Sequence, residues 1–412
     1  MDFIRNYALA NSGTMVSPLY TMWCSLFLLS AGNGRRCYVD HGHFKVFSDM
    51  YAILVGLSGT RKSAAIVPCR RMWRLAYPES PIGPSITSPE DIVLRMATND
   101  SIRVYDDENG KGISHVPYTF FINEFKNFIR HNEEGMITFL TDIYGEEHFN
   151  SSTIKHGLQP IENPVLNLIG CATPQWIEKH FKKELLTGGW GRRVYYIFET
   201  QPQPRITFPI KTKEACEAEI WCINHLQKIA KLAGKITFSP EAREFLDKWN
   251  MKAISPEHNE VVASFLEVRD ILVTRLAIAL CLAYTTPVFV ISLETLVDAI
   301  GIFDDLAGRL PKLTSSMGRN ELTPTQNRLI QLLKDNNGRM AEFVWHRIAG
   351  QDLTEAEYIS AKNFLRNTRQ IVEEAVPGKG TVVFLTETAI EIDAKKKAEE
   401  AAAKDETDDV PA

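Results

Sequence analysis

One short segment of the chain combines glycines, a lysine and a hydroxyl side chain at a spacing that suits phosphate binding. It reads Gly56-Leu57-Ser58-Gly59-Thr60-Arg61-Lys62-Ser63 and, apart from one position, follows the general pattern Gly-x-x-x-x-Gly-Lys-Ser/Thr. Backbone N–H groups at such a turn, with a helix N-terminus behind them, form a concavity for phosphate oxygens. We expect Lys62 to reach the β- and γ-phosphates of ATP, and the Ser63 hydroxyl to join the ligands of Mg²⁺. The pattern therefore predicts an ATP-binding loop over residues 56–64, with Ala64 as its last member.

The loop departs from the pattern at Arg61, which stands where a second glycine is usual. Gly56 allows a tight exit from the preceding strand, and Gly59 supplies a position where φ can be positive. Arg61 either adds a cation near the phosphates or points into solvent. Pro68 is expected to kink or end the following helix. The alternative interpretation is an ordinary glycine-rich turn that happens to precede Lys-Ser.

A second candidate group follows the apolar run Tyr118–Ile122, where Asn123 and Glu124 stand next in the chain. Phosphoryl transfer to water needs a metal-holding group and a residue that positions the water, commonly at the end of the strand next to the phosphate loop. We expect Glu124 to polarise the water and to contribute to the Mg²⁺ site. Asn123 occupies the place of the usual aspartate and offers only a neutral oxygen. The alternative is a buried strand that ends in a solvated acid.

Three further side chains are candidates for contact with the transferred phosphate. Thr173, after the apolar run Val165–Gly170, either senses the γ-phosphate or caps the next helix. The segment Gly188–Val194 carries Arg192 and Arg193 among three glycines. An arginine there would stabilise the spreading negative charge, from the same chain or from a neighbour in a ring, and Arg193 is the stronger candidate. The alternative is a surface pair that stacks on Trp190 or pairs with carboxylates.

The elements that must position these residues alternate along the chain. Short apolar runs predict strands at Tyr51–Val55, Val116–Ile122, Val165–Gly170 and Val194–Phe198, with helical patterns between them. This alternation predicts an α/β fold with a mostly parallel sheet and helices on both faces. Residues 36–47 read as extended chain, and the patterns from Glu214 to Ala307 are almost all helical.

Changes in pattern suggest five regions. We expect an N-terminal helical segment (1–48), the loop-bearing core (49–205), a helical subdomain (206–318), a winged-helix domain (319–390) and a disordered tail (391–412). In the winged helix, the helix Thr354–Arg369 would carry Lys362, Arg366 and Arg369 toward DNA. Residues 322–390 hold eight Lys/Arg and eight Asp/Glu, so a protein-docking role is equally open.

Composition limits the partners. The 412 residues carry a formal net charge of −5, so DNA contact would need a local basic patch. Seven scattered cysteines without a Cys-x-x-Cys pair disfavour a disulfide framework and a zinc site, and fit a reducing cytoplasm. The apolar stretch Pro18–Ala31 is too short to span a bilayer, so we expect a buried core helix there and no membrane partner.

The order of these motifs resembles the ATPase module of phage and plasmid primase-helicase-like proteins, a family often known only by a domain of unknown function. The resemblance covers about residues 15–310, with a winged helix usual after it. It rests on these segments: Tyr51–Ser63, Thr87–Glu90, Phe121–Phe125, Phe139–Tyr144, Asn163–Pro174 and Gly188–Arg193. The resemblance implies a P-loop NTPase core of the AAA+ or recombinase type, ATP hydrolysis with Mg²⁺, and roles for Lys62, Ser63, Glu124 and Arg193. It also implies a homo-oligomer, with a hexameric ring as one form, that works on single- or double-stranded DNA. We expect any primase to be a separate protein.

Three functions remain open at this point. The first is an ATP-driven helicase or translocase of phage or plasmid replication. The second is a loader that places another helicase on DNA. The third is a replication initiator or adaptor that binds nucleotide with little or no turnover, an alternative kept open by Arg61 and Asn123.

Overall fold

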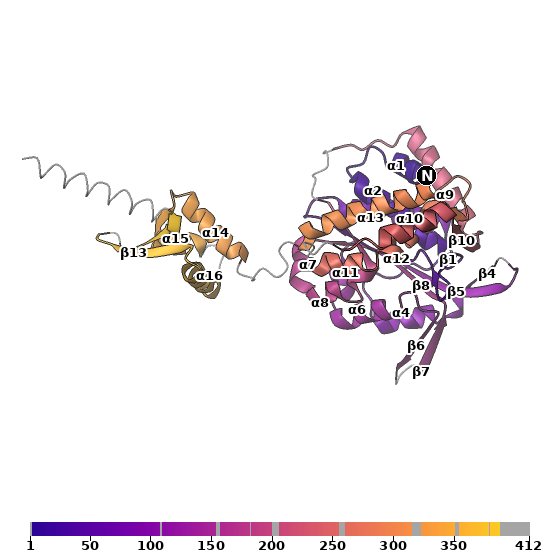
Figure 1. Cartoon of the computed structure of the whole chain (residues 1–412), viewed down its shortest axis with the longest axis horizontal. Coiled ribbons are helices and arrows are strands. Elements are labelled where there is room, and N and C mark those ends of the chain that lie inside the picture. The colour runs from indigo at the N-terminus through magenta and orange to yellow at the C-terminus, as the bar shows by residue number, and fades with distance from the viewer. Residues whose placement is uncertain are drawn as a thin grey trace, which may run out of the picture. The chain divides into compact units, whose positions relative to one another are not determined.

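The computed structural model describes residues 2–107, 109–153, 157–181, 183–199, 206–254, 260–314, 323–350, 354–378 and 380–387. The chain divides into two compact units, Met1–Met317 and Gly318–Ala412 (Figure 1). The expected tail (391–412) lies outside the described residues.

The first unit is built around a five-stranded sheet in the order β4-β5-β8-β3-β9. Its strands are β3 (Tyr51–Val55), β4 (Arg103–Asp106), β5 (Gly112–Ile122), β8 (Pro164–Ala172) and β9 (Val194–Phe198). β5, β8, β3 and β9 are parallel, and β4 pairs antiparallel with β5. The four predicted parallel strands and the mixed α/β class are therefore confirmed. Every residue of β3, β8 and β9 is buried, which explains why β3 and β9 read as apolar runs without a break. The run of β8 is interrupted by Asn167, whose Oδ1 accepts from the backbone N–H of Met50 at 2.8 Å.

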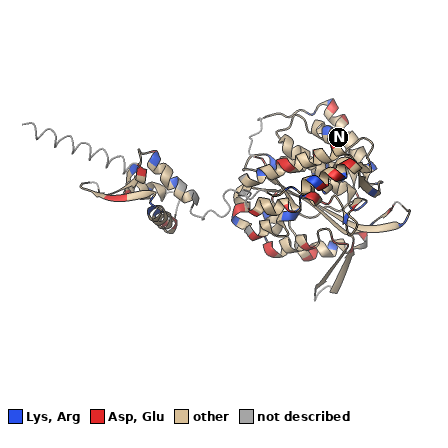
Figure 2. Cartoon of the chain, in the orientation of Figure 1, with Lys and Arg blue, Asp and Glu red and all other residues tan. Residues whose placement is uncertain are grey.

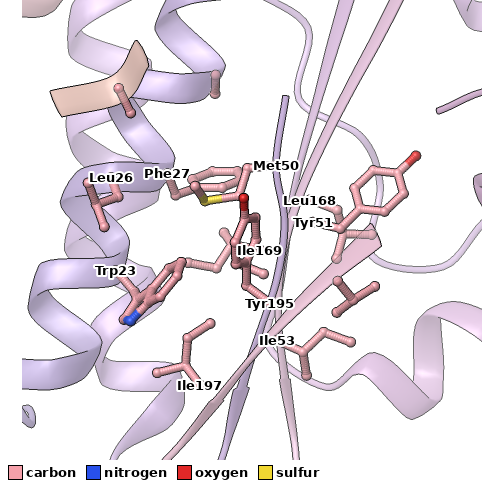
Figure 3. Close-up of a cluster of buried hydrophobic side chains, with 14 of the residues drawn as sticks. Trp23, Leu26, Phe27, Met50, Tyr51, Ile53, Leu168, Ile169, Tyr195 and Ile197 are labelled. Atoms are coloured by element: carbon pink, nitrogen blue, oxygen red, sulfur yellow. The ribbon is translucent and has the colours of Figure 1, made fainter. Parts of the chain in front are cut away.

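Helices cover both faces of this sheet. Figure 3 shows Trp23, Leu26 and Phe27 of α2 (Pro18–Asn33) packed on one face, and Tyr51 pointing from the other. Trp23 packs on Tyr195 with ring centroids 5.1 Å apart. On the opposite face, the Tyr51 hydroxyl donates to the carbonyl oxygen of Leu140 at 3.0 Å. The other α-helices in the described part of residues 2–187 are α1 (Asp2–Ala10), α3 (Lys62–Ala76), α4 (Pro89–Met96), α5 (Phe125–Ile129), α6 (Glu133–Asp142), α7 (Pro174–His180) and α8 (Lys183–Thr187).

Two sequence predictions about helices have different outcomes. The apolar stretch Pro18–Ala31 forms the buried helix α2, as predicted. Pro68 does not end α3, which continues to Ala76. No helix among the described residues is long and apolar enough to cross a membrane.

A second sheet links the N-terminal region to residues after 206, and it was not predicted. Its order is β11-β10-β1-β2, and it contains β1 (Cys37–Asp40), β2 (Lys45–Val46), β10 (Gly234–Phe238) and β11 (Val290–Ile291). β1 pairs in parallel with β10, with Cys37 opposite Gly234. The helices of this part of the chain are α9 (Lys213–Ile229), α10 (Pro240–Asn250), α11 (Glu260–Leu266), α12 (Arg269–Leu282) and α13 (Leu293–Thr314). Of these, α10 and α12 pack against the second sheet. The regions 1–48 and 206–314 therefore share one hydrophobic core with the central sheet.

An ion pair is buried inside this core. Arg275 of α12 contacts the Asp49 carboxylate at 3.0 Å, and 10% and 5% of the two side chains are exposed. The Arg275 guanidinium also lies over the Tyr144 ring, 4.6 Å from its centroid. The pair joins the segment just before β3 to a helix far along the chain.

The described residues of the second unit form three helices and a small antiparallel sheet. Its elements are α14 (Thr323–Lys334), β12 (Arg339–Ala341), α15 (Glu342–Ala349), α16 (Glu355–Asn367), β13 (Ile371–Val376) and β14 (Gly380–Leu385), with strand order β12-β14-β13. α16 begins at a capping box formed by Thr354 and Glu357. The unit has its own core around Trp345, separate from the core of the first unit.

Candidate functional site

The predicted phosphate loop joins the carboxyl end of β3 to the first residue of α3. Gly59 has φ +88° and Arg61 has φ +62°, so both adopt left-handed backbone conformations. Arg61 therefore keeps the backbone geometry that favours glycine, although it carries a side chain. A non-glycine residue costs about 1–2 kcal/mol there, and the surrounding loop must offset that cost. The loop therefore forms its turn with an arginine at the position where the general pattern has a glycine.

Gly56 is the most crowded position of the loop. A Cβ atom there would lie 2.5 Å from the Tyr20 hydroxyl, 2.7 Å from Thr60 Oγ1 and 3.0 Å from the Glu199 carbonyl oxygen. The Tyr20 hydroxyl donates to the carbonyl oxygen of Val55 at 2.7 Å, which anchors the last residue of β3. Only glycine fits this exit from the strand.

The ammonium group of Lys62 folds back over the loop. Its Nζ donates to the carbonyl oxygens of Gly56 at 2.6 Å and Leu57 at 2.8 Å, and lies 3.3 Å from Thr60 Oγ1. Burial lowers the pKa of this ammonium group below its ordinary value. The cation is thus held at the mouth of the turn, where incoming phosphate oxygens can replace the carbonyl acceptors.

The N-terminus of α3 has no side-chain cap: Arg61 occupies the N-cap position and makes no capping hydrogen bond. By contrast, α4, α6 and α7 each begin with a side chain that accepts from a backbone N–H. Ser63 and Ala64 are exposed at the start of α3. The first backbone N–H groups of a helix lack intrahelical partners, and here no side chain of the N-cap residue occupies them. An uncapped helix start of this kind binds anions.

A cleft of about 1270 Å³ opens over this loop. It is lined by residues 57–64, 123–126 and 171–173, together with Met15 and Trp176. The structure therefore brings together the loop, Asn123, Glu124 and Thr173, which come from the ends of β3, β5 and β8. The carboxyl ends of parallel strands meet at one edge of a sheet, and ligands bind in the crevice outside that edge.

The position of Glu124 differs in one respect from expectation. β8 lies between β3 and β5, so the strand that carries Glu124 is not the direct neighbour of the strand before the loop. Glu124 reaches the cleft nonetheless, because β5 ends on the same edge of the sheet. Its Oε2 accepts from Asn127 Nδ2 at 2.9 Å and lies 3.8 Å from Lys126 Nζ, with 59% of the side chain exposed. The carboxylate is held on one side and open to water on the other.

Thr173 lines the cleft but uses its side chain as a helix cap. Its Oγ1 accepts from the backbone N–H of Trp176 at 3.3 Å, at the N-terminus of α7. This geometry is the capping alternative proposed for a threonine before proline.

The two candidate arginines do not line the cleft of their own chain. Arg192 Nε donates to Ser264 Oγ at 2.9 Å, and Arg193 Nη1 donates to the Gly189 carbonyl oxygen at 2.8 Å. The Arg193 guanidinium lies 5.9 Å from the centroid of the Tyr144 ring, whereas Trp190 is buried against Phe125. Arg193 therefore stacks on Tyr144 and not on Trp190.

The charge of the cleft suits a polyphosphate. Arg61, Lys62 and Lys126 line it, against one carboxylate, Glu124. Cys171, below Lys62, does not add a negative charge, because burial raises the pKa of its thiol to about 12. Three cations and one carboxylate leave a positive surface within reach of the uncapped helix.

Six residues of the cleft were not singled out from the sequence as site candidates: Met15, Phe125, Lys126, Cys171, Ala172 and Trp176. Lys126 and Cys171 could have been found, since they lie within two residues of the predicted candidates. Met15 gives no such signal, because it reaches the cleft only through the fold of the N-terminal region.

The candidate DNA-binding residues in the second unit have different surroundings. Lys362 is paired with Glu342, and lies 3.3 Å from Glu373, with 15% of its side chain exposed. Arg366 is exposed and donates to Asn363, and Arg369 follows α16 with φ +57°. β13 carries Glu373 and Glu374, an acidic stretch visible in Figure 2. Lys362 is therefore a structural ion-pair partner within this unit.

No family model matches this chain, and no curated protein shows significant similarity to it.

Proposed function

We propose that this chain binds ATP with Mg²⁺ and hydrolyses it to drive a helicase-like or DNA-translocating motor in phage or plasmid DNA replication. The observation that carries the proposal is the cleft over residues 57–64. There an uncapped helix N-terminus, a lysine ammonium and a carboxylate face one space at the carboxyl edge of a parallel sheet. Phosphoryl transfer needs this combination of anion binding and a group that orients water.

The donors present fit Mg²⁺. The Ser63 hydroxyl, the Asn123 amide oxygen and the Glu124 carboxylate all line the cleft. Mg²⁺ in phosphate sites keeps several waters and takes one or two carboxylates plus phosphate oxygens, so a single carboxylate is sufficient. When bound, the ion would neutralise charge on the phosphates and help to orient them.

The chain's own residues have separate roles in phosphate binding and in activation of the attacking water. Lys62 leaves the carbonyl oxygens of Gly56 and Leu57 and binds the terminal phosphates. Glu124, open to water on one side, orients the attacking water and accepts its proton. Thr173 holds the start of α7 and so shapes the wall of the cleft. Arg193 does not reach the cleft of its own chain, so its role in this proposal requires a neighbouring subunit in an oligomer.

The fold assignment that goes with this function is a P-loop core of the AAA+ or recombinase type, followed by helices and a winged helix. The order of three helices and a β-hairpin in the second unit supports the winged helix. Arg366 and Arg369 are the candidates for DNA contact in it. The proposal places the protein in the cytoplasm of a bacterial host.

A second function, a nucleotide-binding loader, initiator or adaptor with little turnover, is favoured by Asn123 and by the internal pairing of Lys362. Asn123 supplies no negative charge to a metal, and Lys362 is not available for phosphate contact.

The test is an ATPase assay with and without single-stranded DNA on wild type, Lys62→Ala and Glu124→Gln, with the exposed Lys248→Ala as control. We expect DNA-stimulated turnover that both site variants lose and the control keeps. ATP binding by Glu124→Gln without turnover would place Glu124 in the chemical step. Wild type that binds ATP but never hydrolyses it supports the second function. Strand displacement by the purified protein alone separates a motor from a loader.

A further inference from the structure

A second cavity, of about 350 Å³, adjoins the phosphate cleft. The two spaces share Met15, Arg61 and Ala64 in their walls, so one ligand can occupy both. Its volume lies at the lower end of small-molecule sites, which fits one fragment of a nucleotide better than a whole one.

The walls of this cavity come from three separate parts of the chain. The main apolar contributors are Val16, Pro68, Met72, Pro209 and Ile210. Residues 10–16 and 209–211 approach closely, because a Cβ atom on Gly13 would lie 3.3 Å from the Ile210 carbonyl oxygen. The polar residues Asn11, Ser12 and Thr14 also line the cavity. Apolar walls with a few polar groups are typical of sites for flat heterocycles.

Two of the three cations at the cavity are held in ion pairs with one carboxylate. Arg71 of α3 and Lys211 both pair with Glu219 of α9. Arg61, by contrast, is exposed and has no ion-pair partner among the residues that the structure describes. It stands in the wall shared by the two spaces, with its backbone held in the left-handed conformation. A guanidinium placed there can bind a phosphate or a sugar oxygen.

We propose that this cavity binds the base and ribose of the nucleotide whose phosphates occupy the cleft, and that Arg61 binds its ribose and α-phosphate at the passage between them. This inference rests on the proposed ATP binding and extends it. It gives Arg61 a role that the usual glycine could not fill. It also makes residues 10–16 and 209–211 ligand contacts, although neither segment belongs to the phosphate loop.

The experiment compares ATP with inorganic tripolyphosphate by titration calorimetry in the presence of Mg²⁺, using the full chain. Tripolyphosphate carries the same phosphate groups but no base or ribose. We expect wild type to bind ATP about 10–100-fold more tightly, since burial of a heterocycle in an apolar cavity adds that much. Val16→Trp fills the cavity, so it should weaken ATP to the level of tripolyphosphate and leave tripolyphosphate unchanged.

Two further variants make the result independent of folding defects. Leu9→Trp introduces the same side chain at an exposed position of α1 outside the cavity and should change neither affinity. Arg61→Gly restores the residue that the backbone favours, so a several-fold loss of ATP affinity reports the missing guanidinium. Equal affinity of wild type for both ligands, or unchanged ATP binding in Val16→Trp and Arg61→Gly, would overturn this inference and leave ATP binding intact. Failure of wild type to bind either ligand would overturn both.

Discussion

The ammonium nitrogen of Lys62 lies 2.6 Å from the carbonyl oxygen of Gly56, at the two ends of the same loop. Carbonyl oxygens of the loop thus hold the lysine ammonium group, and Gly56 is both an acceptor and the most crowded residue of the turn. Any change that moves Gly56 also moves the lysine.

Gly56→Ala should therefore abolish ATP binding and lower the free energy of unfolding by about 1–3 kcal/mol, the usual cost of overpacking. Tyr20→Phe in the same chain should recover part of the stability, since it removes the hydroxyl 2.5 Å from the new methyl group. Gly301→Ala, in an exposed part of α13 with open space around it, is the control and should be neutral or slightly stabilising. Urea unfolding and nucleotide titration measure both effects; equal behaviour of the two alanine variants would contradict the crowding argument.

The His115 imidazole should make stability depend on pH. It is 1% exposed, and burial together with Arg36, Arg35 and Arg103 lowers its pKa to about 3. Because the folded pKa is below the unfolded value, this residue's contribution is complete above about pH 6.5 and is lost as pH falls toward 3. Between pH 7 and pH 5, wild type should lose about 2 kcal/mol more than His115→Gln. Parallel pH dependences of urea unfolding for the two proteins would show that His115 is protonated without cost.

Removal of one partner of the buried pair between Asp49 and Arg275 should be costly. Arg275→Met leaves the Asp49 carboxylate uncompensated inside the core, which typically costs about 3–5 kcal/mol. Asp49→Asn added to Arg275→Met should regain much of the loss, since no unpaired charge remains. The exposed pair of Lys248 with Glu244 is the control, and Lys248→Met should cause no measurable change in the denaturant midpoint. A small effect of Arg275→Met would mean that water reaches Asp49.

Two variants of Thr173 distinguish a helix-capping role of this residue from a catalytic role. Thr173→Val removes the acceptor for the Trp176 N–H and should cost about 1 kcal/mol, whereas Thr173→Ser keeps the cap and the stability. If capping is its only role, ATP turnover per folded molecule stays within a factor of about two in both variants, well below the loss of about 100-fold or more typical of a catalytic group. A large loss of turnover in Thr173→Val with normal melting behaviour would instead assign Thr173 to the reaction.

In the second unit, Lys362→Met should lower thermal stability without changing DNA affinity at low salt. The Lys362 side chain is occupied by Glu342 and Glu373, and its loss leaves two acids side by side. Arg347→Met, at an exposed position of α15, is the matched control for stability. Fluorescence anisotropy with labelled single- and double-stranded DNA measures the affinity. A uniform weakening of DNA binding by Lys362→Met, with melting unchanged, would mean that the ion pairs open on binding.

Local patterns predicted the parts of the site that depend on neighbouring residues. β3 and β9 have the bounds expected from their apolar runs, and the loop begins at Gly56 as the glycine pattern predicted, whereas residues 62–64 of the predicted loop form the first residues of α3. The pairing of β1 with β10 could not be predicted, because it joins residues about 200 positions apart and neither strand is long enough to show a period. The cavity beside Arg61 was missed for the same reason. Its walls are brought together by packing of residues 10–16 against 209–211, and no pattern within either segment indicates the other.

The order of strands in the central sheet also constrains how the chain can be synthesised. Among the described residues, the strands that pair with β3 are β8 and β9, which leave the ribosome more than a hundred residues after it. During that interval the apolar segment Tyr51–Val55 has no strand partner, and long-range parallel pairing forms slowly. The nascent protein therefore passes through a period in which an apolar strand is open to aggregation, and the yield of folded protein should depend on the rate of translation and on added chaperone.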